Sequence, residues 1–376
     1  MATAPLRIAV LGAGTVGREV VRGLLQPQGD LVDRSPGAEL VGVAARDLPR
    51  AVASGIPESS LTDAPAHLVA SPDTDVIIEL MGGDEPAHTL IAAALGAGKS
   101  VVTANKHVIA HYGPELEATA RRTGAALRFE AAVGGGIPIL APLATDLAAN
   151  RFDLVRGIVN GTTNFILSAM HDSHQGYAEA LADAQEAGYA EADPTADVEG
   201  IDAANKLVIL ARLAFGAWLD PESIDRAAPR ADGQELTAGI TGISAEDVAA
   251  ATAAGKVLKL VAQARMRPTG TAGETEICAA VVPAAVRAIS SLGRVTGGNN
   301  RIELDGEPIG HVAFEGPGAG GEATSSAVLA DVLALARGAG STWGALKAAT
   351  GARAAIKVPF ETPTRYPSGA RYPEID

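Results

Sequence analysis

The sequence has few aromatic residues, a single cysteine and no long hydrophobic run. Aromatic residues make up 3% of the 376 residues and hydrophobic residues 47%, so small aliphatic side chains must fill most of the core. Cys278 is the one cysteine, which excludes a framework of intramolecular disulfides and suits a reducing compartment. Apolar runs such as 207–210 fall far short of the roughly 20 residues that span a bilayer, and no signal peptide opens the chain. We therefore expect a cytoplasmic protein with no membrane partner.

Positive charge is also scarce. The 30 lysines and arginines face 44 aspartates and glutamates, which gives a formal charge of −14. A field of that sign repels nucleic acid and anionic membrane surfaces, so we expect no nucleic-acid partner. Any anionic ligand must instead be captured by local features of the chain.

Residues 1–130 alternate short apolar runs with helical patterns. Strands are predicted at 7–11, 40–45, 76–80, 100–103 and 126–129, and helices at 15–25, 85–97 and 114–123. Strands that alternate with helices predict an α/β fold with a Rossmann-type, doubly wound parallel sheet. A stretch rich in proline, glycine and aspartate, Gln26 to Gly37, is predicted to be a loop.

The pattern changes after Gly134-Gly135-Gly136. A helix is predicted at 137–149, helices dominate 160–215, and another helix is predicted at 324–337; strand-like runs occur at 257–266, 277–282, 301–304 and 311–314. This mixture predicts a second, α+β domain. We expect a nucleotide-binding domain at 1–138, the α+β domain at 139–315, a helix within 316–340 that returns to the first domain, and a C-terminal extension at 341–376.

A GxGxxG motif, Gly12-Ala13-Gly14-Thr15-Val16-Gly17, lies between a predicted strand and a predicted helix. In such a motif the first glycine allows a tight turn, the second lets the backbone approach a pyrophosphate, and the third lets the helix pack on the strand. The helix N-terminus adds free N–H groups and a partial positive charge for the phosphates. We expect all six residues to bind a nicotinamide dinucleotide; a glycine-rich turn without a ligand is the alternative.

Two residues after the second strand affect the choice between NAD and NADP. Arg46 is suited to a 2′-phosphate, whereas Asp47 is suited to the ribose hydroxyls of NAD. A solvated arginine is an equal alternative. The sequence favours NADP and leaves NAD open.

Asp202 and Lys206 lie four residues apart on a mostly apolar helix, so they share one face. A lysine on a buried helix must be paired or must line a cleft. When an alcohol is oxidised, a base takes the hydroxyl proton as hydride leaves the carbon, and a lysine can serve if burial or a second cation brings its pKa towards neutrality. We predict Lys206 as this acid/base, with an ordinary salt bridge as the alternative. The acids Glu191, Asp193 and Asp197 just upstream favour a bound cation or a substrate ammonium group.

Several segments resemble the homoserine dehydrogenase family and occur in its order along the chain, from residue 7 to about residue 337. They are Thr103–Lys106, Glu130–Pro138, Asn160–Leu167, Glu191–Pro194 with Asp202 and Lys206, and Gly316–Gly320. The resemblance implies interconversion of L-homoserine and L-aspartate 4-semialdehyde with NAD(P), by hydride transfer with lysine acid/base catalysis. That step leads to threonine, methionine and isoleucine.

The resemblance also implies roles for single residues. Lys106 is implied to be a second active-site lysine that also contacts the cofactor. The alternative is that Lys106 is only a solvated residue at the start of a helix. Substrate contacts are implied for Glu191, Asp197 and Asp202, and further cofactor contacts for Thr103, Gly188 and Gly320.

A bound sodium ion and a homodimer are further implications of the resemblance. The cation would be held by the carboxylate of Glu130 and by carbonyl groups, with Glu130, Val133, Gly135 and Ile137 as ligands; a plain hinge is the alternative. The dimer would form through the sheet of the α+β domain. About forty residues follow the helix that ends near 337, so we expect the short form without a regulatory amino-acid-binding domain.

Two other functions remain open at this point. One is a dehydrogenase for another small alcohol, and the acids around Lys206 favour an amino-acid substrate over it. The other is a catalytically silent NAD(P)-binding, redox-sensing protein, which would need neither Lys106 nor Lys206.

Overall fold

A computed structural model describes residues 5–26, 37–227, 237–269, 271, 274–349, 351–356 and 372–375. Most of the loop predicted at 26–37 and most of the tail after residue 356 lie outside these residues. The chain forms two compact units. The first unit comprises Met1–Ala148 with Ala319–Gly351, and the second comprises Ala149–Gly318 with Ala352–Asp376.

The first unit contains a parallel sheet of six strands in the order β3-β2-β1-β4-β5-β6. The order reverses between β1 and β4, which is the switch point where doubly wound sheets bind ligands at the carboxyl ends of their strands. The prediction of a Rossmann-type parallel sheet is confirmed. The strands are β1 (Leu6–Leu11), β2 (Ala38–Ala44), β3 (Leu61–Thr62), β4 (Val76–Glu79), β5 (Ser100–Thr103) and β6 (Leu127–Arg128).

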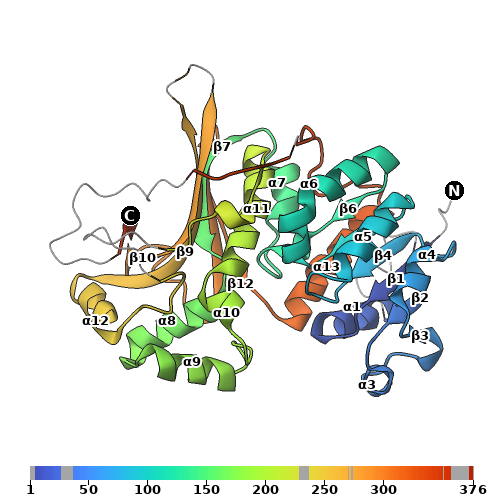
Figure 1. The fold of residues 1–376 in the computed structure, drawn as a ribbon, viewed down its shortest axis with the longest axis horizontal. Helices are drawn as coiled ribbons and strands as arrows, with labels where there is room; N and C mark the ends of the chain where they lie inside the picture. Colours follow the sequence, from blue (N-terminus) through green and yellow to red (C-terminus); the bar gives the residue numbers. More distant parts are fainter. Residues whose placement is uncertain are drawn as a thin grey trace. The chain divides into compact units, whose positions relative to one another are not determined.

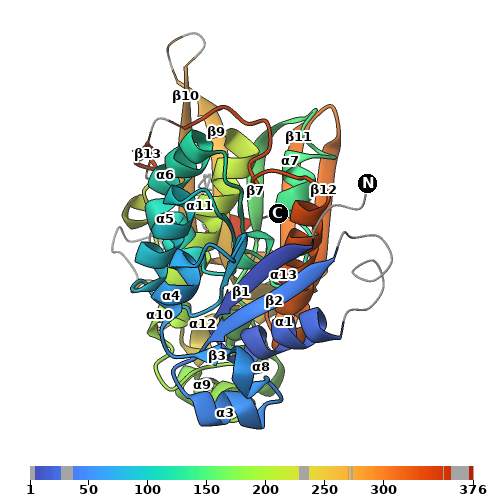
Figure 2. The ribbon, with the colours of Figure 1, turned by 90° about the vertical axis from the view of Figure 1, so that its right-hand side faces the viewer.

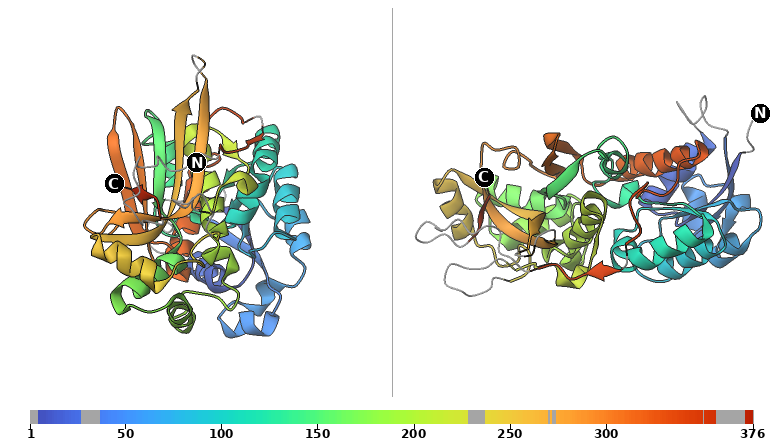
Figure 3. Two further views of the ribbon diagram at one scale, coloured as in Figure 1. Left: turned by 60° about the vertical axis from the view of Figure 1, so that its left-hand side comes forward. Right: turned by 90° about the horizontal axis from the view of Figure 1, so that it is seen from above.

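Helices cover both faces of this sheet (Figures 1 and 3). On one face α1 (Thr15–Leu25) and α13 (Gly321–Ala336) pack against each other and on the buried residues Ile8, Val10 and Ile78. The remaining helices of this unit are α3 (Leu48–Ala53), α4 (Pro65–Ala70), α5 (Ala87–Gly96), α6 (Lys106–Thr123) and α7 (Leu140–Ala144). Helix α13, the last one in the described part of the chain, therefore belongs to the core of the first unit.

Two helices of the first unit differ from their predicted bounds. The helix predicted at 114–123 begins at Lys106, because the Asn105 side chain caps it by accepting the N–H of Val108 at 3.2 Å. Pro114 is an interior residue of α6 and not its start. The helix predicted at 137–149 was too long: α7 covers Leu140–Ala144 only.

The second unit contains a mixed sheet in the order β12-β11-β7-β9-β10-β14. Its long strands are antiparallel, and only the short β14 is parallel to its neighbour β10. Strands β9, β10, β11 and β12 were predicted from the sequence. Strand β7, which lies inside the sheet, and the short β14 were not predicted. The strands are β7 (Arg151–Ile158), β9 (Lys256–Pro268), β10 (Thr275–Arg287), β11 (Asn299–Glu307), β12 (Gly310–Pro317) and β14 (Glu374–Ile375).

Helix α11 (Ile201–Phe215) packs on β7, β9 and β10 and is buried along most of its length. Figure 2 shows β9, β10, β11 and β12 as long strands of this sheet. The other helices of the unit are α8 (Gly161–Ser173), α9 (Tyr177–Glu186), α10 (Thr195–Val198) and α12 (Ala245–Ala253), and β8 (Trp218–Leu219) pairs with β13 (Ala352–Arg353). Within the described parts of the chain, no helix combines the length and hydropathy needed to cross a bilayer.

Candidate functional site

The glycine motif joins β1 to α1 at the switch point of the first unit. Gly12 has φ +110°, and a Cβ added there would lie 2.6 Å from the Leu80 carbonyl oxygen. Gly14 is exposed, with no atom within 4 Å of an added Cβ. At Gly17 an added Cβ would lie 1.9 Å from the Gly12 oxygen. The motif thus combines a left-handed turn, an open backbone and a tight helix–strand contact, and no side chain caps α1.

The N-terminus of α13 lies beside this motif. Gly320 is its N-cap with φ +123°, and a Cβ added at Gly321 would lie 3.0 Å from Thr15 Cγ2. No side chain caps α13 either. The predicted cofactor residue Gly320 is therefore close to the glycine motif, although more than 300 residues separate them in sequence.

The two residues after β2 have different surroundings. Asp47 caps α3, since its Oδ1 accepts the N–H of Arg50 at 3.0 Å. Arg46 is exposed. Both residues are exposed, and one oxygen of the carboxylate that would bind the ribose hydroxyls of NAD already caps a helix.

Thr103 and Lys106 lie at the carboxyl end of β5. Thr103 is fully buried, and its hydroxyl donates to the buried Glu79 at 2.6 Å. Lys106 is the first residue of α6 and is partly buried. Glu79 was not singled out in the sequence. The signal was present, because it is the one charged residue of the apolar strand β4.

The Glu130 carboxylate, predicted to bind sodium, accepts hydrogen bonds from backbone N–H groups. Glu130 Oε1 accepts the N–H groups of Ile139 at 2.8 Å and Leu140 at 2.9 Å, and Oε2 accepts that of Ala141 at 2.6 Å. Burial, followed by the nearby Asp331 carboxylate, raises the pKa of Glu130. Three N–H dipoles directed at one carboxylate disfavour a cation on the same oxygens. In this segment, therefore, only main-chain oxygens are suited to bind a cation. Gly134 and Gly135 turn the backbone there, with φ +73° and +59°.

In the second unit, Lys206 and Asp202 form a buried ion pair on α11. Lys206 Nζ donates to Asp202 Oδ2 at 2.7 Å and to the Val159 carbonyl oxygen at 2.7 Å. Their side chains are 10% and 6% exposed. Among the described residues these are the acceptors of Lys206, and they account for two of its three N–H groups. The described residues provide no acceptor for the third N–H.

Asn160 links this ion pair to a second acid. Its Nδ2 donates to Asp202 Oδ2 at 2.8 Å and to Asp197 Oδ1 at 2.7 Å. Asp197 Oδ2 is 2.9 Å from the Thr162 hydroxyl. Asn160 also caps α8 by accepting the N–H of Thr163. The structure thus brings Asp197, Asp202 and Lys206 together through a residue to which the sequence analysis gave no role.

Glu191 lies outside this network. It is exposed, and its carbonyl oxygen accepts a hydrogen bond from Gln185 at 3.0 Å. No hydrogen bond or ion pair reported for the described residues joins its carboxylate to Asp202 or Lys206. The loop that carries it starts at Gly188, an exposed residue with φ +76°. The stacked rings of Tyr189 and Phe165, with centroids 4.4 Å apart, fix this loop to α8.

A second buried lysine also contacts α8. Lys259 Nζ donates to Asn164 Oδ1 at 2.9 Å and to the Val295 carbonyl oxygen at 2.6 Å, and the residue is 2% exposed. Burial lowers the pKa of Lys259 to about 8. Its one signal in the sequence is a lysine among the apolar residues of strand β9.

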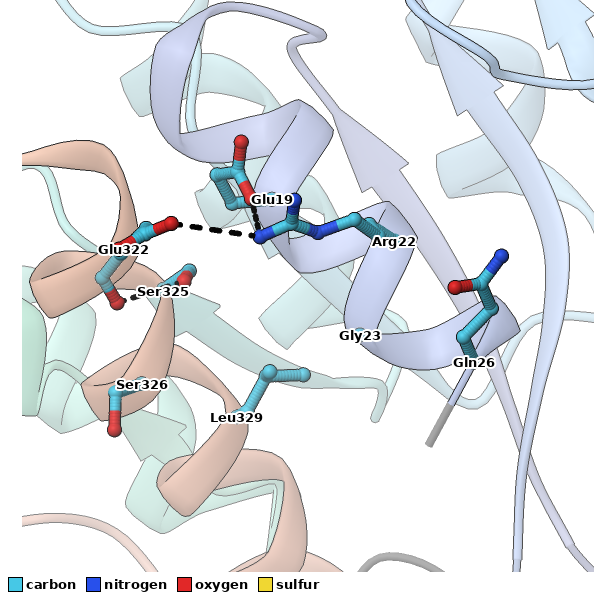
Figure 4. A pocket seen from close by; sticks show the side chains of 8 residues that line it. All are labelled: Glu19, Arg22, Gly23, Gln26, Glu322, Ser325, Ser326 and Leu329. Atoms are coloured by element: carbon cyan, nitrogen blue, oxygen red, sulfur yellow. Dashed lines mark hydrogen bonds and ion pairs between the residues drawn. The ribbon is translucent and has the colours of Figure 1, made fainter. Parts of the chain in front are cut away.

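A hollow of about 410 Å³ lies between α1 and α13. Figure 4 shows Arg22 directed towards Glu19 and Glu322 across this hollow. None of the predicted site residues lines it; the lining residues are Glu19, Arg22, Gly23, Gln26, Glu322, Ser325, Ser326 and Leu329. This hollow is thus separate from the predicted site residues described above.

Two family models match the chain over most of its length. Residues 12–130 match the NAD binding domain of homoserine dehydrogenase, and residues 138–333 match the homoserine dehydrogenase model. The first match contains the glycine motif, Thr103 and Lys106, and the second contains Asp197, Asp202 and Lys206.

Known proteins of the same kind are similar in sequence and in structure. A homoserine dehydrogenase from Synechocystis is 43% identical over 335 residues, covering 87% of this chain and 72% of that protein. The crystal structure of a homoserine dehydrogenase from Thiobacillus denitrificans has a TM-score of 0.81 and 40% identity, covering 89% of this chain and 73% of that one. A hyperthermophilic archaeal homoserine dehydrogenase in complex with NADPH has a TM-score of 0.70 and 27% identity, covering 88% of this chain and 97% of that one.

Proposed function

The chain belongs to the homoserine dehydrogenase family, and from this premise we propose how its residues carry out the family's reaction. That reaction is the NAD(P)-dependent interconversion of L-homoserine and L-aspartate 4-semialdehyde, an oxidation and reduction at a CH–OH group. The observation that carries our assignment of roles is the buried cluster of Lys206, Asp202 and Asn160.

We propose that Lys206 moves the proton. When bound, the nicotinamide accepts the hydride from the carbinol carbon during oxidation and returns it during reduction. As the neutral amine, Lys206 takes the hydroxyl proton in the first direction; as the ammonium, it gives a proton to the forming alkoxide in the second. Asp202 and the Val159 carbonyl oxygen accept two of its N–H groups, and these two hydrogen bonds fix the orientation of Nζ. An ammonium group held in this way is suited to an oxygen on which negative charge develops.

Substrate binding is proposed for the acids of the second unit. Asp197 and Asp202 converge on Asn160, and their carboxylates suit the ammonium group of an amino acid. Glu191 would add a third carboxylate from its exposed loop. Lys106, at the start of α6, is proposed to act where cofactor and substrate meet, with Thr103 beside it. Gly188 is proposed to contact the cofactor from the second unit.

For the cofactor we propose NADP, held by the residues from Gly12 to Gly17 with Gly320. The support is that Arg46 is exposed at this position and that one oxygen of Asp47 already caps α3. Arg46→Ala should lower kcat/KM for NADP by about tenfold, the effect of one lost charge-assisted contact, and leave that for NAD within about twofold. Steady-state kinetics with both cofactors measures this. Equal losses with NADP and NAD would show that Arg46 does not contact a 2′-phosphate.

A monovalent cation, a dimer and the cytoplasm complete the proposal. A sodium ion would be held by main-chain oxygens among Glu130, Val133, Gly135 and Ile137, and its effect would be to fix that loop. A homodimer would form through the sheet of the second unit, as the resemblance implies. The lone, buried Cys278 and the acidic charge suit a cytoplasmic enzyme.

The wild-type protein tests the proposed function. Reduced nicotinamide is followed by its absorbance while homoserine, serine, threonine and simple alcohols are offered with NADP or NAD. We expect turnover with homoserine, and at least a hundredfold lower kcat/KM with the others, because the acids of the site select an amino acid of one length. Equal turnover of simple alcohols would favour the other dehydrogenase. Cofactor binding with no turnover would favour the silent redox sensor.

A further inference from the structure

Glu79 is a buried acid at the centre of the switch point. It is the last residue of β4, it is fully buried, and it is level with Leu11 of β1 and Thr103 of β5. Leu11 immediately precedes the glycine motif, and Thr103 is three residues before Lys106. Glu79 therefore stands between the two segments that we propose contact the cofactor.

Each carboxylate oxygen of Glu79 serves a different loop. Oε1 accepts the N–H groups of Met81 at 2.7 Å and Gly82 at 3.3 Å, in the loop after β4. Oε2 accepts the hydroxyl proton of Thr103 at 2.6 Å, at the end of β5. A single side chain thus joins both loops at the carboxyl edge of the sheet.

On one side these contacts reach the glycine motif. A Cβ added at Gly12 would lie 2.6 Å from the Leu80 oxygen and 3.0 Å from Met81 N. The turn of the motif therefore packs on the same peptide whose N–H group Glu79 holds. A shift of Met81 would displace Gly12.

On the other side they reach Lys106. The Thr103 oxygen that donates to Glu79 accepts the N–H of Asn105 at 2.9 Å. Asn105 caps α6 and donates from Nδ2 to the Gly83 carbonyl oxygen at 2.8 Å. Lys106 is the next residue, so its backbone is set by a chain of hydrogen bonds that starts at Glu79.

The neutral partners of Glu79 make a purely stabilising role costly. Its partners are the N–H groups of Met81 and Gly82, the Thr103 hydroxyl and the Asn105 side chain, and burial is the largest influence that raises its pKa. A buried carboxylate without a cation is expensive to keep. Its position is better explained by the geometry that it imposes on both loops.

We propose that Glu79 is a positioning residue for the dinucleotide, which sets the glycine motif and Lys106 relative to each other through Met81 and Thr103. The identity of the dinucleotide, NADP, is taken from the proposed function, and the proposal rests on that function in this respect alone. It assigns no contact between Glu79 and the cofactor itself.

The test is NADPH binding, measured by fluorescence titration, and steady-state kinetics of Glu79→Gln. The amide keeps the shape but cannot accept from Met81, Gly82 and Thr103 together. We expect the Kd of NADPH to rise about tenfold and kcat to fall about tenfold, with a smaller change in the KM of homoserine, because the acids proposed to bind its ammonium group lie in the second unit. Amide hydrogen exchange of the cofactor-free variant should rise at 80–84 and 104–108.

Thr103 provides a second, independent pair of variants. Thr103→Val removes the hydroxyl and should lose as much as Glu79→Gln, whereas Thr103→Ser keeps the hydroxyl and should lose less than Thr103→Val. The double variant Glu79→Gln/Thr103→Val should be no worse than either single variant, because both break one chain of contacts. Wild-type NADPH affinity in Glu79→Gln, or additive losses in the double variant, would overturn the proposal. Failure of wild type to oxidise homoserine would instead refute the proposed function, since NADPH binding is measured without homoserine.

Discussion

At the scale of single residues, one oxygen of Asp202 serves two partners. Oδ2 accepts from Lys206 at 2.7 Å and from Asn160 at 2.8 Å. The spacing of Asp202 and Lys206 was enough to predict their pairing, because residues four apart on a helix share a face. The part of Asn160 was not predictable, because 42 residues separate it from Asp202 and only the fold brings them together.

Removing the charge of Asp202 should affect both binding and chemistry. In Asp202→Asn the amide cannot accept from Lys206 and Asn160 as a charged group does, so we expect the homoserine KM to rise about 10- to 100-fold, with a fall in kcat. Steady-state kinetics measures both. Asp183→Asn, on an exposed part of α9, is the matched control and should behave as wild type. An unchanged homoserine KM would remove Asp202 from the substrate site.

Lys259 predicts a pH dependence of stability. Burial lowers its pKa to about 8 from an ordinary 10.5, so between these pH values the unfolded chain binds a proton that the folded chain does not. The free energy of unfolding therefore rises with pH across this window, by roughly 3 kcal/mol in total. Below pH 8 both states are protonated and the burial penalty is fully present.

The measurement is urea unfolding of wild type and Lys259→Met from pH 7 to pH 10. Other titrating groups cancel in the difference between the two proteins. The stability of wild type relative to the variant should rise as the pH passes from 8 towards 10. A constant difference would mean that Lys259 titrates as an ordinary lysine.

At the scale of elements, strands and helices with a clear local pattern of apolar residues were easier to predict than those whose bounds depend on contacts with other residues. The first unit followed from its alternating apolar runs. In β7 the buried Phe152 and Leu154 alternate with the exposed Arg151 and Asp153, but Val155 is buried too, so the alternation stops after four residues and the strand was missed. The start of α6 depends on the Asn105 cap, and Pro114 within the helix concealed it.

The short helix α7 depends on a distant acid. Glu130 accepts the N–H groups of Ile139, Leu140 and Ala141, so Glu130→Ala leaves these donors without their acceptor. We expect a loss of stability of about 2–4 kcal/mol, measured by urea unfolding. Glu58→Gln, at an exposed residue, is the control and should stay within about 0.5 kcal/mol.

A second substitution at the same residue, Glu130→Gln, tests the cation site. If main-chain oxygens hold sodium, replacing sodium by a bulky organic cation should change the stability of wild type and of Glu130→Gln equally. A sodium effect that disappears in Glu130→Gln would instead assign the carboxylate as a ligand, against the geometry described above.

At the scale of the whole molecule, the chain builds each unit from two separate segments. It leaves the first unit after Ala148 and returns to it at Ala319, so α13 completes the core beside the glycine motif. The composition and motifs predicted two domains and a returning helix. The proposed cofactor contacts lie mainly in the first unit, and Lys206 with its acids lies in the second. Cofactor affinity and proton transfer should therefore be separable by mutation.

Lys206→Met tests the central claim, that Lys206 moves the proton of a homoserine dehydrogenase. The side chain keeps its length and loses its acid/base group, so kcat for homoserine oxidation should fall by about 10²- to 10⁴-fold. The Kd of NADPH should stay within about twofold of wild type, which also shows that the variant is folded. Lys256→Met, which removes a partly buried ion pair with Glu374 on the sheet of the second unit, is the control and should keep normal turnover. A Lys206→Met enzyme that turns over homoserine at close to the wild-type rate would contradict the account.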